Sequence, residues 1–269
     1  MATTPVPVPD GVGRTALGMA RVRADETRRP DRLFDDPYAH AFVAAAPDAL
    51  PDGGALQPDD PMAAILHSAI IRTRYYDEYL INAGCRQIVL AAAGLDTRAY
   101  RLPWPDGVHL FELDLPDVLT FKQHVLADAG ATPRCQRTAV PIDLRDDWPA
   151  HLTAAGHQHT EPTAWLLEGL LIYLTATEAA NLLSRIGALS APGSRLACDH
   201  TPAPAHNRST PRSAPFTTMW KGGLAGDTPA WLATHGWQVH IDDRDTIAAA
   251  YHRPAPTPAP GGFITATAG

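Results

Sequence analysis

The sequence predicts an α/β protein whose mostly parallel sheet has helices on both faces. The main observation is a repeated alternation of short apolar runs, expected to be strands, with stretches of helical spacing. The length of 269 residues suits one α/β domain, and 45% hydrophobic with 19% charged residues is ordinary for a globular chain. Because neither an internal repeat nor a linker divides the sequence, we expect a single domain over residues 1–269.

The expected strands fall into two groups. The first group consists of short apolar runs at 88–92, 108–114, 136–142, 164–167 and 195–199. The second group, at 237–241 and 263–268, is separated by a helix and a proline-rich loop. We therefore expect a seven-stranded sheet that is mostly parallel and ends in antiparallel C-terminal strands at its edge.

Helices are expected between and before these strands. Their predicted positions are 15–27, 62–83, 118–127, 146–155, 175–189, 229–235 and 243–251. Thr175 with Glu178 forms the pattern of a capping box, and Asp243 is a candidate N-cap.

Two segments do not follow the alternation. Residues 1–60 are expected to form an N-terminal helical cap. Residues 200–226 are rich in Pro, Ser and Thr with few periodic apolar positions. A loop of this length in a compact domain is usually a functional lid or a disordered insertion, so we interpret it as a lid-like insertion.

Composition excludes several classes of function. A net charge of −7 with scattered Lys and Arg argues against nucleic-acid binding. Three widely spaced cysteines without a C-x-x-C pair suggest neither a disulfide framework nor a metal site. No apolar run is long enough to span a bilayer, and the N-terminus lacks the features of a signal peptide. We expect a soluble cytoplasmic protein with a small-molecule partner; the sequence leaves its oligomeric state open.

One segment is typical of a pocket for an adenosine-containing cofactor. The apolar run 87–91 leads into a turn of small residues, Ala92, Ala93 and Gly94, and Asp114 ends the next strand twenty residues after Gly94. Small residues let the backbone approach a ligand, and a carboxylate accepts hydrogen bonds from ribose hydroxyls. The alternative is an ordinary strand-turn-helix whose next strand happens to end in Asp.

Acidic residues follow the expected strands at four places: Asp96, Asp114, Asp143 and Glu168. Because the carboxyl ends of parallel strands meet at one edge of a sheet, these side chains are expected around one cleft. Asp143 is placed to face an adenine amino group, and Glu168 lies at the mouth of the cleft. Four acids at one edge favour a ligand site over coincidental solvated strand ends.

Several blocks of sequence occur in an order that resembles a known family. They are Leu33-Phe34-Asp35-Asp36-Pro37-Tyr38-Ala39, Arg72-Thr73-Arg74, Gly94-Leu95-Asp96-Thr97-Arg98, Phe111-Glu112-Leu113-Asp114-Leu115-Pro116, Asp143-Leu144-Arg145 and Leu167-Glu168-Gly169-Leu170-Leu171. The chain resembles the leucine carboxyl methyltransferase family, in particular its bacterial branch of small-molecule O-methyltransferases. The resemblance covers about residues 14–268.

The resemblance implies S-adenosyl-L-methionine as cofactor and a Rossmann-like class I methyltransferase fold. For the adenosine part of the cofactor, it places Asp114 on the ribose hydroxyls and Asp143 and Leu144 around adenine. For the methionine part, it places Gly94 beneath it, Arg72 on its carboxylate, Glu168 near its amino group and Arg23 as a second carboxylate contact. Ala92 and Leu115 are also expected among the cofactor-binding residues. The residues alone leave another interpretation of Arg72 open. It could be a surface helix residue whose aliphatic stem packs on apolar groups while its charged end reaches water.

Many family members have Gly where this chain has Ala92, whose methyl group restricts positive φ and narrows the approach to the cofactor.

The acceptor decides whether a base is needed. A carboxylate is already ionised near neutral pH, whereas a phenol or alcohol profits from a positioned histidine. His200, directly after the fifth strand, is the best-placed candidate catalytic base, ahead of His67 and His206. The alternative for each is a solvated or hydrogen-bonded histidine.

The predicted function is methyl transfer to a carboxylate or hydroxyl of a small polyketide-like or aromatic metabolite. Two alternatives stay within the resemblance: methylation of a protein C-terminal carboxylate, and a cofactor-binding scaffold or cyclase-like protein without methyl transfer. A nicotinamide-dependent oxidoreductase is disfavoured because the G-x-G-x-x-G fingerprint is absent.

Overall fold

The computed structural model describes residues 7–49, 61–201, 217–224, 226–255 and 260–269, and this part of the chain contains a seven-stranded sheet. The strands are β1 Gln87–Ala91, β2 His109–Asp114, β3 Gln136–Pro141, β4 Thr163–Leu167, β5 Arg195–His200, β6 Trp237–Asp243 and β7 Gly262–Ala268. The helices are α1 Val12–Thr27, α2 Ala39–Ala45, α3 Pro61–Asn82, α4 Arg98–Arg101, α5 Pro116–Asp128, α6 Trp148–Ala154, α7 Ala176–Ala188, α9 Thr228–Thr234 and α10 Arg244–Ala250, with 3-10 turns η1 Pro47–Ala49 and η2 Leu171–Tyr173.

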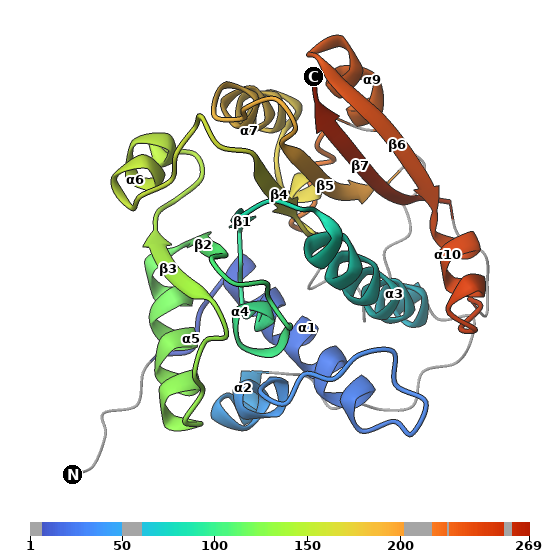
Figure 1. Ribbon diagram of the computed structural model, residues 1–269. Coiled ribbons are helices and arrows are strands. Elements are labelled where there is room, and N and C mark those ends of the chain that lie inside the picture. The colour runs from blue at the N-terminus through green and yellow to red at the C-terminus, as the bar shows by residue number, and fades with distance from the viewer. Residues whose placement is uncertain (1–6, 50–60, 202–216, 225, 256–259) are drawn as a thin grey trace.

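The strand order across the sheet is β3-β2-β1-β4-β5-β7-β6 (Figure 1). The strands from β3 to β5 run parallel, and β7 lies antiparallel between β5 and β6. The predicted antiparallel C-terminal strands are therefore confirmed, with β6 at the edge. The strand order reverses between β1 and β4, so the loops that follow these two strands diverge and a crevice opens between them.

The central strands β1, β2 and β4 are buried on both faces of the sheet, which explains their nearly continuous apolar sequences. Ile88 and Leu90 of β1 belong to one core, while Val89 and Ala91 belong to the other. Helices α1, α2, α3 and α5 cover the first face, and α6, α7 and α9 cover the second (Figure 1). The first layer supplies Leu17, Phe42, Ile71 and Phe121, and the second supplies Trp148, Leu183 and Leu232.

Most predicted boundaries lie within a few residues of the observed ones, and two predicted caps are confirmed. Thr175 and Glu178 form the capping box of α7, and the Asp243 carboxylate accepts a hydrogen bond from Thr246 N at the start of α10. Helix α5 begins at Pro116, two residues before the predicted start, because proline is well suited to the first turn of a helix.

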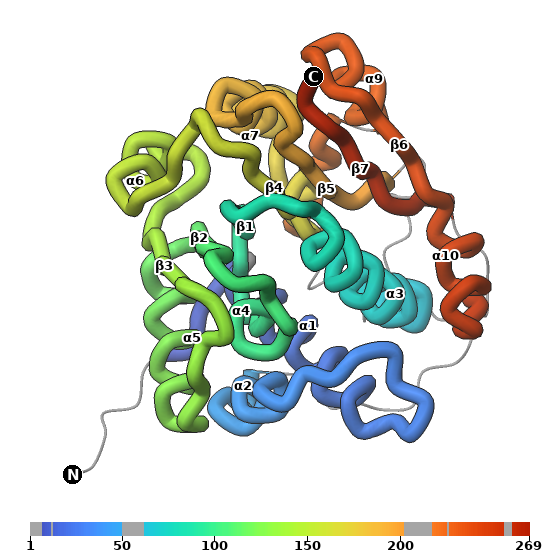
Figure 2. The backbone as a smooth tube through the Cα atoms, viewed as in Figure 1, coloured from blue at the N-terminus to red at the C-terminus, as the bar shows by residue number. Residues whose placement is uncertain are grey.

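The N-terminal helices pack against the sheet's own helices. Helix α1 contacts α2 and α3, and α2 contacts α5. Helix α10, from the C-terminal part of the chain, lies beside α3 (Figure 2). Residues 1–6 and 50–60 of the predicted N-terminal cap lie outside the described residues. Within the described ranges, no helix has both the length and the apolarity needed to cross a membrane.

The predicted lid-like insertion is described only in part, because residues 202–216 and 225 lie outside the described ranges. The backbone N–H groups of Lys221 and Gly222 donate hydrogen bonds to Ile172 O over 2.8 and 3.0 Å. Residues 217–224 are thus joined to η2, directly after β4. The lid role of this segment stays a prediction.

Candidate functional site

A cavity of about 590 Å³ lies at the carboxyl ends of the parallel strands, and its walls also include α1 and α3. The predicted site residues that line it are Arg23, Arg72, Ala92, Gly94, Asp114, Leu115, Glu168 and His200. This volume is typical of a pocket for a small molecule. Among the described residues, no cluster of three or more His, Cys, Asp or Glu side chains could hold a metal ion.

The turn after β1 has an unusual backbone. Ala92 has φ 56° and Gly94 has φ 49°, so both adopt the left-handed conformation. For Ala92 this conformation costs about 1 kcal/mol, because its Cβ approaches the following carbonyl. At Gly94 a side chain would meet α1, since an added Cβ would lie 3.2 Å from the Cβ of Ala16. Glycine at position 94 therefore allows α1 to close over the turn.

Asp114 is fixed by backbone groups at the end of β2. Its Oδ2 accepts a hydrogen bond from Gly94 N over 2.5 Å, and its Oδ1 accepts one from Leu115 N over 2.7 Å. Burial raises the pKa of the Asp114 carboxyl, although these two amide donors oppose the shift. Each oxygen keeps a further lone pair for a ligand hydroxyl.

Glu168, at the end of β4, has an arginine on each oxygen. Arg72 Nε donates to Oε1 over 2.9 Å, and Arg98 Nη1 donates to Oε2 over 2.7 Å. Burial favours the neutral acid, but the positive charges of Arg98 and Arg72 outweigh it and lower the pKa of Glu168. Glu168 is therefore an ionised carboxylate in the wall of the cavity.

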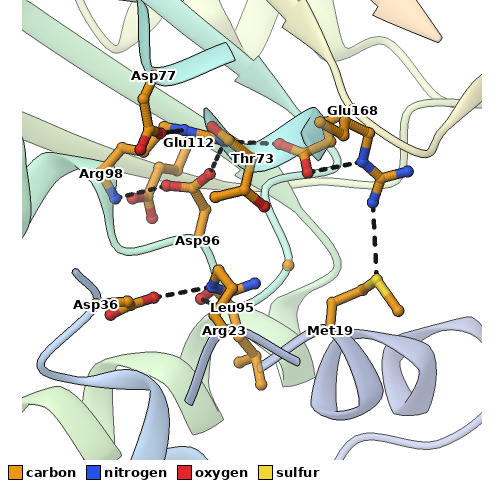
Figure 3. Close-up of polar contacts among 12 residues, drawn as sticks. Met19, Arg23, Asp36, Thr73, Asp77, Leu95, Asp96, Arg98, Glu112 and Glu168 are labelled. Atoms are coloured by element: carbon orange, nitrogen blue, oxygen red, sulfur yellow. Dashed lines mark hydrogen bonds and ion pairs between the residues drawn. The ribbon is translucent and has the colours of Figure 1, made fainter. Parts of the chain in front are cut away.

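Arg98 is anchored on its other side (Figure 3). Its Nε donates to Asp77 Oδ1 over 2.7 Å, and its Nη1 donates to Asp96 Oδ2 over 2.5 Å. The side chain is 2% exposed, and Trp104 Nε1 fixes its backbone carbonyl over 2.8 Å. Arg98 thus joins α3, the turn after β1 and the end of β4. Arg98 was not among the site residues predicted from the sequence, although it is the last residue of the Gly-Leu-Asp-Thr-Arg block.

Arg23 has two structural contacts. Its Nε lies 2.8 Å from Asp36 Oδ2, and its Nη2 donates to Leu95 O over 2.6 Å (Figure 3). These contacts fasten α1 to the turn after β1. The role of Arg23 as a second carboxylate contact stays a prediction.

Asp143 and Leu144 follow β3, but within the described part of the chain they do not line the cavity. The Asp143 carboxylate pairs with Arg145, with 2.5 Å between Oδ2 and Nη2. Ile142 N donates to Asp114 O over 2.8 Å, so this loop starts beside the Asp114 backbone. Their assignment to adenine stays a prediction.

Asp199 also lines the cavity, although it was not predicted from the sequence as a site residue. Its Oδ2 accepts a hydrogen bond from Gly169 N over 2.5 Å and lies 3.6 Å from Arg72 Nη1. Burial raises the pKa of its carboxyl group. The sequence does contain a signal for Asp199, because it is an acidic residue at the end of a parallel strand, like Asp114 and Glu168. The adjacent His200 was predicted as the site residue instead.

His200 lines the cavity at the end of β5. Burial lowers its pKa, so the imidazole is neutral at neutral pH. Within the described residues, its Nδ1 is buried without a hydrogen-bond partner. A neutral imidazole in this position is able to accept a proton.

Comparison with known families agrees with this arrangement. The model of the leucine carboxyl methyltransferases matches residues 16–187, which is more than half of the chain. This chain belongs to the leucine carboxyl methyltransferase family. The family prediction from the sequence blocks is thereby confirmed, and the matched segment includes every predicted cofactor-binding residue.

Two relatives match almost the whole chain. A protein of Parafrankia sp. (strain EAN1pec) is 49% identical over 273 residues, which cover 95% of this chain and 87% of the relative. A protein of Frankia alni is 50% identical over 275 residues, which cover 99% and 98%. Both carry the provisional name of S-adenosyl-L-methionine-dependent methyltransferase.

A solved structure shows the same fold at low sequence identity. The crystal structure of a Thermobifida fusca protein, provisionally named a methyltransferase, matches with a TM-score of 0.51 at 17% identity. The match covers 93% of this chain and 94% of that one. Together with the strand order, it confirms the prediction of a Rossmann-like class I methyltransferase fold.

Proposed function

We propose that this member of the leucine carboxyl methyltransferase family transfers a methyl group from S-adenosyl-L-methionine to an oxygen atom of a small, largely apolar metabolite. Family membership and the names of the relatives support the methyl transfer. The observation that carries the proposal is the meeting of Asp114, Arg72 and Glu168 in one cavity at the strand ends. Their chemistry matches the ribose, carboxylate and amino groups of this cofactor.

The adenosine end of the cofactor fits the β1–β2 side of the cavity. The Asp114 carboxylate is fixed by two amides and still has lone pairs for two ribose hydroxyls. Ala92 and Gly94 have little or no side chain, so a ligand in the cavity is able to approach their backbone, and Leu115 provides an apolar surface beside them. Asp143 and Leu144 begin beside the same strand end, which supports their assignment to adenine.

The methionine end fits the α3–β4 side. Arg72 presents a guanidinium that is able to bind a carboxylate by two parallel hydrogen bonds. Glu168 is ionised and accepts hydrogen bonds from a protonated amino group. Arg23 lines the same wall. The bound cofactor supplies the methyl group on a sulfonium, and the protein's residues supply alignment and exclusion of water.

The acceptor is proposed to lie on the β4–β5 side, away from Asp114. The cavity residues there include an apolar and aromatic set, Ile65, Ile172, Tyr173, Leu224 and Phe263, beside the charged Asp199 and Arg244. A surface of this kind favours a polyketide-like or aromatic molecule over a charged peptide. The neutral His200 in the same region supports a hydroxyl acceptor, since a carboxylate acceptor needs no base.

The proposal is tested by product analysis. The purified protein is incubated with S-adenosyl-L-methionine carrying an isotopically labelled methyl group and a panel of phenols, aliphatic alcohols and aromatic carboxylic acids. We expect one acceptor class to gain the label on oxygen, with one S-adenosylhomocysteine formed per methyl transferred. Label on nitrogen or carbon would contradict oxygen methylation, whereas no transfer to any acceptor despite cofactor binding would favour a cofactor-binding scaffold.

A further inference from the structure

Two polar contacts lead from Glu168, in the cavity wall, through Arg98 to Asp77. Its Oε2 accepts from Arg98 Nη1 over 2.7 Å, and Arg98 Nε donates in turn to Asp77 Oδ1 over 2.7 Å. Asp77 belongs to α3 and is 6% exposed. Figure 3 shows Glu168, Arg98 and Asp77 in this sequence of contacts.

The geometry points to Arg98 as the positioning residue for Glu168: it fixes the orientation of the carboxylate so that Glu168 binds the amino group of the cofactor's methionine part. This inference rests on the proposed function, in which Glu168 binds the amino group of S-adenosyl-L-methionine. Arg98 itself touches neither the acceptor nor the transferred methyl group in this scheme. Its effect reaches the cofactor through Glu168.

Two observations support a role beyond simple packing. Arg98 is almost fully buried, and a buried guanidinium is costly unless carboxylates and carbonyls surround it. Its donors are spread over Asp77, Asp96 and the carbonyl of Thr73, so the side chain has a single orientation. With that orientation fixed, one N–H always points at Glu168.

Arg72 cannot perform this task alone. It lies on the other oxygen of Glu168 and also 3.6 Å from Asp199 Oδ2. Its guanidinium is also the group proposed to bind the cofactor carboxylate, so its hydrogen bonds are shared between that ligand and Glu168. Arg98 then remains as the fixed cation beside Glu168 and keeps the carboxylate ionised.

The experiment compares two probes that differ only at the methionine end. S-adenosylhomocysteine carries the amino acid part, whereas 5′-methylthioadenosine lacks it. We expect Arg98→Gln to weaken S-adenosylhomocysteine binding by about 10- to 100-fold, as for the loss of a charge-assisted contact. Binding of 5′-methylthioadenosine should change by less than about threefold.

Arg101→Gln is the matched control. Arg101 is 4% exposed and donates two hydrogen bonds to Asp77, over 2.6 and 2.7 Å. Arg101 also lines the cavity, but within the described chain no hydrogen bond or ion pair joins it to Glu168. This variant should lose stability to a similar extent but keep the parent's ratio of the two affinities. Arg98→Lys, which retains the charge, should restore part of the lost selectivity and serves if Arg98→Gln does not fold.

Each outcome has a separate meaning. If Arg98→Gln, or Arg98→Lys in its place, weakens both probes equally, Arg98 is only structural and the inference is wrong. If Arg101→Gln changes the affinity ratio as strongly as the Arg98 variant, the effect belongs to the whole charge network and the inference is also wrong. If the parent binds 5′-methylthioadenosine but not S-adenosylhomocysteine, or binds neither, the proposed cofactor itself fails.

Discussion

The backbone N–H of Gly94 donates a hydrogen bond to the Asp114 carboxylate over 2.5 Å, which ties the turn after β1 to the end of β2. The neighbouring amide of Ala93 donates to Leu113 O over 3.0 Å and extends the same connection. A carboxylate fixed by backbone groups loses little further freedom when a ligand binds. The turn after β1 and the end of β2, which are proposed to bind the nucleoside, are therefore held together by one short contact.

Replacing Asp114 should remove most of the cofactor affinity. Asp114→Ala deletes an acceptor proposed to bind two ribose hydroxyls, and hydrogen bonds to charged groups contribute about 1.5–3 kcal/mol each. We expect S-adenosylhomocysteine affinity to fall at least about 10-fold in calorimetric titration. The matched variant Asp114→Asn keeps an oxygen for the Gly94 amide but has no charge, so its loss should be smaller. Unchanged binding by Asp114→Ala would show that the site is misplaced.

Ala92→Gly should stabilise the protein. Ala92 has φ 56°, a backbone conformation that glycine adopts without a steric penalty. We expect the free energy of unfolding to rise by about 0.5–1 kcal/mol. The neighbouring Ala93→Gly is the control, because Ala93 has no positive φ and is buried. It should be destabilising by about 0.4–1 kcal/mol, because glycine gives the unfolded chain more conformational freedom. Denaturant unfolding measures both, and the same sign for the two variants would contradict the backbone argument.

His157 should make stability depend on pH. Burial lowers its pKa to about 4, with the charges of His159 and His109 adding to the shift. Its Nε2 lies 2.9 Å from Thr163 Oγ1, and among the described residues its Nδ1 has no hydrogen-bond partner. Between pH 6.5 and about 4 the unfolded chain binds more protons at this residue than the folded one. The stabilisation is therefore complete above pH 6.5 and is lost as pH falls through this window.

The pH effect of His157 is measured by chemical unfolding from about pH 7 to pH 4. We expect His157→Gln to remove on the order of 2 kcal/mol of the parent's pH-dependent loss. His151→Gln, at an exposed position of α6, should leave the pH dependence as in the parent. Identical pH profiles for the parent and His157→Gln would refute the assignment.

His200 should act as a base only if the acceptor is a hydroxyl. Removal of a general base typically costs 10²- to 10⁴-fold, so we expect His200→Gln to lower kcat by about 100-fold with little change in the KM for the cofactor. Because burial lowers the pKa of His200, the parent's rate should be constant at neutral pH and fall only at pH values below the ordinary histidine range. An unchanged kcat would assign the reaction to an ionised carboxylate and exclude His200 from it.

The architecture could be predicted because it depends on local patterns. Apolar runs, the capping box at Thr175 and the N-cap at Asp243 each specify an element without long-range information, and all three are confirmed. The family blocks placed Asp114 and Glu168 at the strand ends for the same reason. These residues do line one cavity.

The charge network could not be predicted, because it is built from contacts between distant segments. Arg98 meets Asp77 and Glu168, which are 21 and 70 positions away, and neither spacing has a signature in sequence. Asp143 had a sequence signal, but the signal did not specify the direction of its side chain. Its position after a strand predicted that it lies at the cavity, whereas its carboxylate pairs with the neighbouring Arg145. Position along a strand does not specify where a loop side chain points.

The most direct test of the central claim is calorimetric titration of the purified protein with S-adenosylhomocysteine, with NAD as the comparison ligand. We predict one site per chain with a dissociation constant in the micromolar range for S-adenosylhomocysteine, and no detectable heat from NAD. Failure of S-adenosylhomocysteine to bind, or equal binding of the two ligands, would contradict a methyltransferase site in this cavity.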